Sequence, residues 1–158
     1  MLIREINKDE YNLLKEFTYE AVFAEDENDL PCRTVLDEPR VKVYYDNFGK
    51  DDDCALVAIV DDKIVGIAWA RILAEENGGY GNIDKDTPEL AMSLLKEYRN
   101  KGIGTKLLEE LIYLLKEKGY CKFSLSVDKN NYAAKLYKKI GFEIVEENEE
   151  DYIMIYKF

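Results

Sequence analysis

Apolar residues return every three or four positions in several segments of this chain, as they do along the buried face of a helix. The segment Lys8–Phe23 follows this spacing, and so does the segment that begins at Ile103. Glu38–Phe48 also favours a helix, and a further helix is expected to begin at Asn131. In the helix from Ile103, one face carries Ile103, Leu107, Leu108, Leu111, Ile112 and Leu115.

Other segments are short and rich in β-branched residues, a pattern typical of strands. Two of them, Cys54–Val60 and Lys63–Leu73, flank the turn residues Asp61 and Asp62 and are predicted to form a hairpin. The acidic stretch 24–36 and the glycine-rich stretch 75–81 are predicted to be loops. The remaining predicted strands are Leu2–Ile6, Glu89–Leu95, Cys121–Val127, Phe142–Val145 and Tyr152–Phe158.

This order of elements contains no internal repeat and no linker, so residues 1–158 are predicted to form a single domain of the α/β (α+β) class. Hydrophobic residues make up 47% of the chain and charged residues 35%, the balance of a globular protein. No apolar stretch reaches the ~20 residues that span a bilayer, so no membrane partner is expected. Residues 1–5 lack the build of a signal peptide.

The charge of the chain bears on its expected partners, and its cysteines bear on its expected location and on metal binding. The net charge of −11 argues against a nucleic-acid partner and would attract cationic small molecules, including amines. Three scattered cysteines are typical of reduced thiols, which favours a cytoplasmic location. With no histidine and no close cysteine pair, no metal site is expected.

One turn carries candidate chemistry, because Arg99, Gly102 and Gly104 form the pattern Arg-x-x-Gly-x-Gly between a strand and a helix. Glycines let the backbone approach a ligand closely, and the first N–H groups of a helix have no internal partner. Together with the helix dipole they make a cradle for pyrophosphate. Leu107 occupies the place where a dinucleotide fingerprint needs a third glycine, and no Walker A run is present. Alone, the hexapeptide is equally consistent with an ordinary turn.

A second segment follows the strand Cys121–Val127 and reads Asn131-Tyr132-Ala133-Ala134-Lys135-Leu136-Tyr137, with Gly141-Phe142 after it. With these motifs in order across residues 89–142, the chain resembles the GNAT superfamily of N-acetyltransferases, which use acetyl-coenzyme A. The resemblance implies a GNAT acyltransferase fold, a mixed central sheet of about six to seven strands flanked by about four helices. In that fold the fourth and fifth strands splay apart, and the pantetheine arm fills the gap.

The resemblance also implies which residues bind acetyl-coenzyme A. The backbone of Leu94, at the end of the central strand, is expected to hold pantetheine and to stabilise the oxyanion. Arg99 would stand beside the pyrophosphate, and Asn131 would either orient the cofactor arm or cap its helix. The complete expected set is Leu94, Leu95, Arg99, Asn100, Lys101, Gly102, Ile103, Gly104, Thr105, Asn131 and Tyr137.

Two residues are candidates for proton transfer. Tyr137 occupies the place where many family members carry the tyrosine that protonates the leaving thiolate, although a packing role is the alternative for any of twelve tyrosines. Glu89, early on the central strand, is the candidate base for the attacking amine. A solvated carboxylate after Pro88 is an equally good interpretation of Glu89, and water would then take the proton.

The acceptor pocket is expected to come from the first half of the chain, with Phe23, Trp69, Arg71 and Tyr80 as candidates. Trp69 and Arg71 share a strand face, and Arg71 could bind a substrate carboxylate or pair with a protein carboxylate. The acceptor is expected to be an amine of a small molecule or peptide, and a homodimer is a possible assembly. The alternative function is an acetyl-coenzyme A-binding regulator that acetylates nothing.

Overall fold

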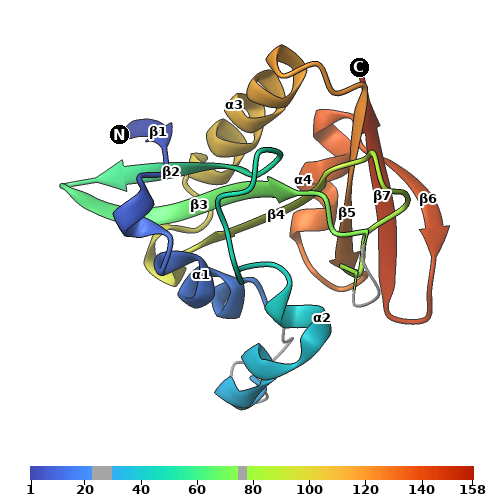
Figure 1. The fold of residues 1–158 in the computed structure, drawn as a ribbon, viewed down its shortest axis with the longest axis horizontal. Coiled ribbons are helices and arrows are strands. Elements are labelled where there is room, and N and C mark those ends of the chain that lie inside the picture. Colours follow the sequence, from blue (N-terminus) through green and yellow to red (C-terminus); the bar gives the residue numbers. More distant parts are fainter. Residues whose placement is uncertain (23–29, 75–77) are drawn as a thin grey trace.

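The computed structural model of the chain describes residues 1–22, 30–74 and 78–158. Its centre is a mixed seven-stranded sheet of order β1-β2-β3-β4-β5-β7-β6, in which only β4 and β5 pair in parallel (Figure 1). The predicted fold class is confirmed. The strands are β1 (Leu2–Glu5), β2 (Cys54–Val60), β3 (Lys63–Arg71), β4 (Glu89–Leu94), β5 (Lys122–Asp128), β6 (Glu143–Glu147) and β7 (Asp151–Lys157).

Helices cover both faces of the sheet (Figure 1). On one face, α1 (Leu13–Ala21) packs against a core that contains Val57 and Trp69. On the other, α3 (Ile103–Glu117) and α4 (Ala133–Ile140) share a larger core with Leu56. Alternation along the strands divides the apolar residues between the two cores. The face of α3 predicted from the sequence is the buried one, since Ile103, Leu107, Leu108, Leu111 and Leu115 all lie in the larger core.

Two predicted helices are shorter than expected. In the segment 8–23, a 3-10 turn at Lys8–Glu10 precedes α1. In the segment 38–48, α2 (Pro39–Lys42) is a single turn, and hydrogen-bonded turns follow it. The carbonyl groups of Val43, Asp46 and Asn47 accept hydrogen bonds from the guanidinium of Arg71. A 3-10 helix at Arg33–Asp37 begins within the predicted loop 24–36.

The parallel strands β4 and β5 touch at a single pair, Glu89 with Ser124, and a hydrogen bond of 3.0 Å joins the Ser124 N–H to the Pro88 carbonyl. Beyond this pair the strands part, as predicted, and Figure 1 shows β2–β4 running in a different direction from β5–β7. The Leu95 N–H donates to the Val65 carbonyl of β3 over 2.8 Å, so the N–H and C=O groups of the odd-numbered residues of β4 point toward β3. Those of Leu90, Met92 and Leu94 face the gap.

Candidate active site

A cavity of about 590 Å³ lies where β4 and β5 part. Both candidates for proton transfer, Glu89 and Tyr137, line this cavity. Tyr80, Glu149 and Glu150 line it too and are exposed at the surface, so the cavity opens to solvent. The strand residues in its wall are Trp69 of β3, Glu89, Leu90, Ala91 and Met92 of β4, Ser126, Val127 and Asp128 of β5, and Asp151 of β7.

Glu89 is 2% exposed, and its two carboxylate oxygens have different surroundings. Oε2 accepts hydrogen bonds from the Tyr44 hydroxyl and, over 3.1 Å, from the Gly81 N–H. Oε1 has no hydrogen-bond partner among the described residues. Burial raises the pKa of Glu89 to about 7, although the two hydrogen bonds and the charge of Arg40 oppose the rise. A carboxylate with a free oxygen and a near-neutral pKa is suited to act as a base.

Glycine is required beside this carboxylate. A Cβ atom added at Gly79 would lie 2.1 Å from Glu89 Oε1 and 2.9 Å from the Tyr44 hydroxyl oxygen. A larger residue at position 79 would therefore displace the carboxylate or the tyrosine that binds it.

Tyr137 lies on α4, where its ring contacts Phe142 at a centroid distance of 5.6 Å. The side chain is 7% exposed, and burial raises the pKa of its phenol to about 12. The hydroxyl is therefore protonated at neutral pH. It makes no hydrogen bond within the described part of the chain, so it is available to donate one to a ligand in the cavity.

The glycine turn has the features expected of a phosphate cradle. Asn100 has φ +62° and Gly102, the residue before α3, has φ +83°, so the backbone turns back on itself there. Within the described ranges, none of the N–H groups from Asn100 to Thr105 donates a hydrogen bond, and the first helical bond runs from Lys106 to Gly102. These donors, at the positive end of a 15-residue helix, fit a pyrophosphate group.

The two polar side chains predicted to flank the cofactor make contacts within the protein. Arg99 donates from Nε to the Leu94 carbonyl over 3.1 Å and forms an exposed ion pair with Glu20 of α1 at 3.3 Å. Asn131 Oδ1 accepts the N–H of Ala133, the first residue of α4, over 2.9 Å, which supports the capping role although Tyr132 is at the N-cap position. Asn131 also lines the cavity, so the second role stays a prediction.

Of the four predicted acceptor-site residues, Trp69 and Tyr80 line the cavity, and Phe23 lies outside the described residues. Trp69 is also a core residue, 1% exposed, whose indole N–H donates to the Tyr44 carbonyl over 2.9 Å. The guanidinium of Arg40 lies 4.2 Å from the centre of the exposed Tyr80 ring.

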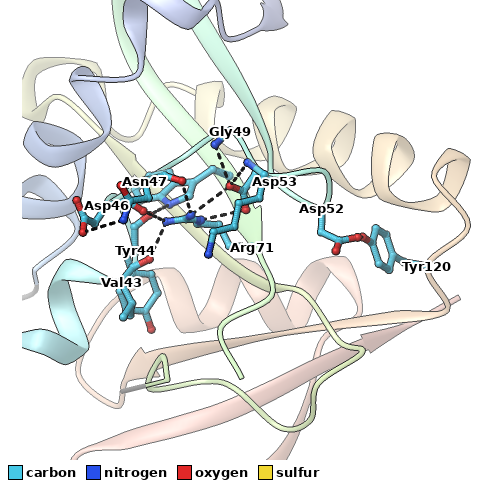
Figure 2. Close-up of polar contacts among 11 residues, drawn as sticks. Val43, Tyr44, Asp46, Asn47, Gly49, Asp52, Asp53, Arg71 and Tyr120 are labelled. Atoms are coloured by element: carbon cyan, nitrogen blue, oxygen red, sulfur yellow. Dashed lines mark hydrogen bonds and ion pairs between the residues drawn. The ribbon is translucent and has the colours of Figure 1, made fainter. Parts of the chain in front are cut away.

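Arg71 does not line the cavity and is not placed to bind a substrate carboxylate there. It is 4% exposed, and its Nε and one Nη donate to Asp53 over 3.0 and 3.1 Å (Figure 2). Its remaining N–H groups donate to the carbonyls of Val43, Asp46 and Asn47. All five donors of a guanidinium are thus used within the protein. The alternative, pairing with a protein carboxylate, is what the structure shows.

Sequence reasoning missed Tyr44, because it lies in the turns after α2 and belongs to no motif. It also missed the acidic character of the cavity mouth. The turn between β6 and β7 carries Glu149 and Glu150, and nothing in the sequence pattern indicates that it lines the gap between β4 and β5. Besides Glu89, the acidic lining residues are Asp128, Glu149, Glu150 and Asp151, and no lysine or arginine is among the described lining residues.

Residues 10–142 match the model of the Acetyltransferase (GNAT) family, and the chain belongs to this family. The probable N-acetyltransferase san of Drosophila melanogaster is 32% identical over 115 residues, which cover 69% of this chain and 59% of that protein. An N-alpha-acetyltransferase of Saccharolobus solfataricus is 38% identical over 98 residues, 56% of either chain. This chain thus spans just over half the length of these two curated relatives.

The fold has a solved counterpart in the PaiA N-acetyltransferase of Thermoplasma acidophilum, whose crystal structure contains coenzyme A. It covers 99% of this chain and 98% of its own at a TM-score of 0.65 and 23% identity. Among the residues described here, no three His, Cys, Asp or Glu side chains are grouped to hold a metal ion. Nor does any helix in the described ranges have the length and apolar character needed to cross a membrane.

Proposed function

We propose that the protein is an N-acetyltransferase that moves the acetyl group of acetyl-coenzyme A to an amine. The observation that carries the proposal is the pairing, in one solvent-open cavity, of a buried carboxylate with a pKa of about 7 and a protonated phenol. Base and acid of this kind are what amine acetylation requires. A protein that only bound acetyl-coenzyme A would gain nothing from burying Glu89 at a cost in stability.

Acetyl-coenzyme A would bind along the gap between β4 and β5. The unpaired N–H groups from Asn100 to Thr105 would hold its pyrophosphate, with Arg99 beside them. The gap-facing backbone of Leu94 would bond to the pantetheine arm, as a neighbouring strand would. When bound, the cosubstrate supplies an activated acetyl thioester at the inner end of this gap.

The acceptor nitrogen attacks the thioester carbonyl directly, so that a C–N bond forms and the C–S bond breaks. Glu89 accepts the proton that a cationic amine loses before it attacks, and the second proton, lost from nitrogen as the C–N bond forms, restores the hydroxyl of Tyr137. Tyr137 donates its hydroxyl proton toward the leaving sulfur. The Met92 N–H faces the gap and Met92 lines the cavity, so it is better placed for the oxyanion than Leu94, the donor predicted from the sequence.

The mouth of the cavity favours a positively charged acceptor. Its lining carries five carboxylates, including Glu149 and Glu150, and no lysine or arginine from the described residues. Neither of these two glutamates forms an ion pair with the described part of the chain. A cationic amine would therefore be attracted to the mouth and lose its proton at Glu89. Val35 and Val41 add an apolar wall that suits the carbon chain of a small-molecule or peptide amine.

Turnover of acetyl-coenzyme A, followed through release of free thiol, tests this function against a panel of alkylamines, diamines, amino acids and basic peptides. We expect turnover with at least one cationic amine and loss of turnover in Glu89→Gln. Tight binding of acetyl-coenzyme A with no turnover across the panel would instead support the regulator.

A further inference from the structure

Tyr44 lies between Glu89, the candidate base, and Tyr80, which lines the cavity. Its hydroxyl donates to Glu89 Oε2 and accepts the Tyr80 N–H over 2.9 Å. Its backbone carbonyl accepts the Trp69 indole N–H over 2.9 Å, which anchors the residue to the core of the sheet. Tyr44 therefore holds a fixed place relative to β3, on which Trp69 lies, and β4, which carries Glu89.

The two donors to Glu89 act on one oxygen. The Tyr44 hydroxyl and the Gly81 N–H both reach Oε2, whereas Oε1 is unpartnered among the described residues. A carboxylate held in this way cannot rotate to exchange its oxygens without breaking both bonds. Oε1 is buried and lies against the backbone of Gly79, where a side chain would displace it.

We propose that Tyr44 is a positioning residue for the acetyl transfer: its hydroxyl, with the Gly81 N–H, fixes Glu89 Oε2 and thereby holds the carboxylate in the cavity wall, where it meets the acceptor amine. This inference rests on the proposed function, in which Glu89 is the base. It assigns to Tyr44 a second effect, since a donor on Oε2 stabilises the ionised carboxylate that must exist before a proton can be accepted.

The pKa values are consistent with this role. Burial and the neighbouring Glu89 charge raise the pKa of Tyr44 well above 10, so its hydroxyl stays protonated and keeps donating. The hydrogen bond from Tyr44 is the largest of the effects that oppose the burial of Glu89, whose pKa is about 7. The other charged or titratable groups around Glu89 are Arg40 and Tyr80, and on the cavity walls Tyr137, Asp128, Glu149, Glu150 and Asp151.

The test compares Tyr44→Phe with Tyr45→Phe. The control removes the same hydroxyl from the next residue, whose hydrogen bond of 2.7 Å goes to the Leu36 carbonyl, away from Glu89. In Tyr44→Phe we expect the acid limb of the kcat/KM profile to move up by about one to two pH units, because a hydrogen bond to a charged group is lost. Activity at pH 7 should fall roughly tenfold, while the KM for acetyl-coenzyme A stays unchanged.

The pKa of Glu89 can also be measured without any acceptor, by following its carboxyl carbon by NMR as the free protein is titrated. A raised pKa of Glu89 in Tyr44→Phe alone would support the inference even if no amine were acetylated. An unshifted pKa and pH profile in folded Tyr44→Phe would overturn it while leaving the acetyltransferase function intact. If Tyr44→Phe does not fold, 3-fluorotyrosine at position 44 should lower the Glu89 pKa, because a more acidic phenol donates more strongly; an unshifted value would overturn the inference.

Discussion

Replacing Glu89 by glutamine should make the protein more stable at pH 8 and change its stability little near pH 4. The carboxylate is 2% exposed, and burial raises its pKa from 4.5 to about 7. Below pH 4.5 the group is protonated in the folded and the unfolded chain and costs nothing. As the pH rises from 4.5 to 7, the unfolded chain ionises first, so the wild-type protein loses stability across this window.

The size of the effect follows from the two pKa values. A difference of 7 − 4.5 = 2.5 units, at 1.36 kcal/mol each, amounts to about 3 kcal/mol at pH 8. Glutamine has almost the same shape and no charge, so it avoids this cost at every pH. For a chain of 158 residues, the unfolding temperature should rise by roughly 6–12 °C at pH 8.

Thermal or urea unfolding of both proteins at several pH values between 4 and 8 measures the difference. Because the comparison is between pH values, a constant change caused by the amide itself cancels. The reasoning is refuted if the stability difference between the variant and the wild type does not grow from pH 4.5 to 7. The same variant should lose kcat/KM at neutral pH, and the loss should shrink as rising pH deprotonates the acceptor amine.

Three further outcomes are expected. Tyr137→Phe should lower kcat by about 10²–10⁴-fold with little change in acetyl-coenzyme A binding, and a retained kcat would make Tyr137 structural. Gly102→Val should lose at least about tenfold in acetyl-coenzyme A affinity, measured by calorimetry. It should also lose about 1 kcal/mol of stability, because the φ of Gly102 is +83°. Gly104→Ala, at a position with no positive φ, should keep its stability. Glu149→Gln with Glu150→Gln should raise the KM of a diamine roughly two- to tenfold at low salt, and an equal rise for an uncharged acceptor would remove the cationic preference.

The sequence predicted the parts of the site that lie on long elements or within motifs. The glycine turn could be placed because a periodic helix follows it, and Tyr137 because it belongs to a spaced motif. Glu89 could be named from its place on the central strand, but its burial and raised pKa could not, nor could the hydrogen bonds from Tyr44 and Gly81 that oppose the rise. Those two residues lie 45 and 8 positions away in the chain, in turns with no periodic pattern.

The choice between the two roles of Arg71 could not be made from the sequence, for a related reason. A strand pattern shows which face a side chain takes but not which distant carboxylate meets it there. Asp53 lies 18 positions before Arg71, within the run Asp51–Asp53, where three adjacent aspartates look alike in the sequence. Only one of them is turned toward the guanidinium and buried with it, whereas Asp52 accepts the Tyr120 hydroxyl instead (Figure 2).

Because Glu89 and Ser124 form the single pair between β4 and β5, the sheet consists of two halves joined at one position. In a continuous sheet many hydrogen bonds join each pair of neighbouring strands. Here β4 and β5 are joined by one pair and by the packing of the helices on the sheet. A molecule that forms hydrogen bonds to the facing edges of β4 and β5 would replace the missing hydrogen bonds between them. Its binding would therefore also hold the two halves of the sheet together. By mass action it would raise the unfolding free energy by RT ln(1 + [L]/Kd), which at a hundredfold excess over Kd is about 2.7 kcal/mol. While it is bound, acetyl-coenzyme A would then be a reactant and would also take the place of a strand between β4 and β5.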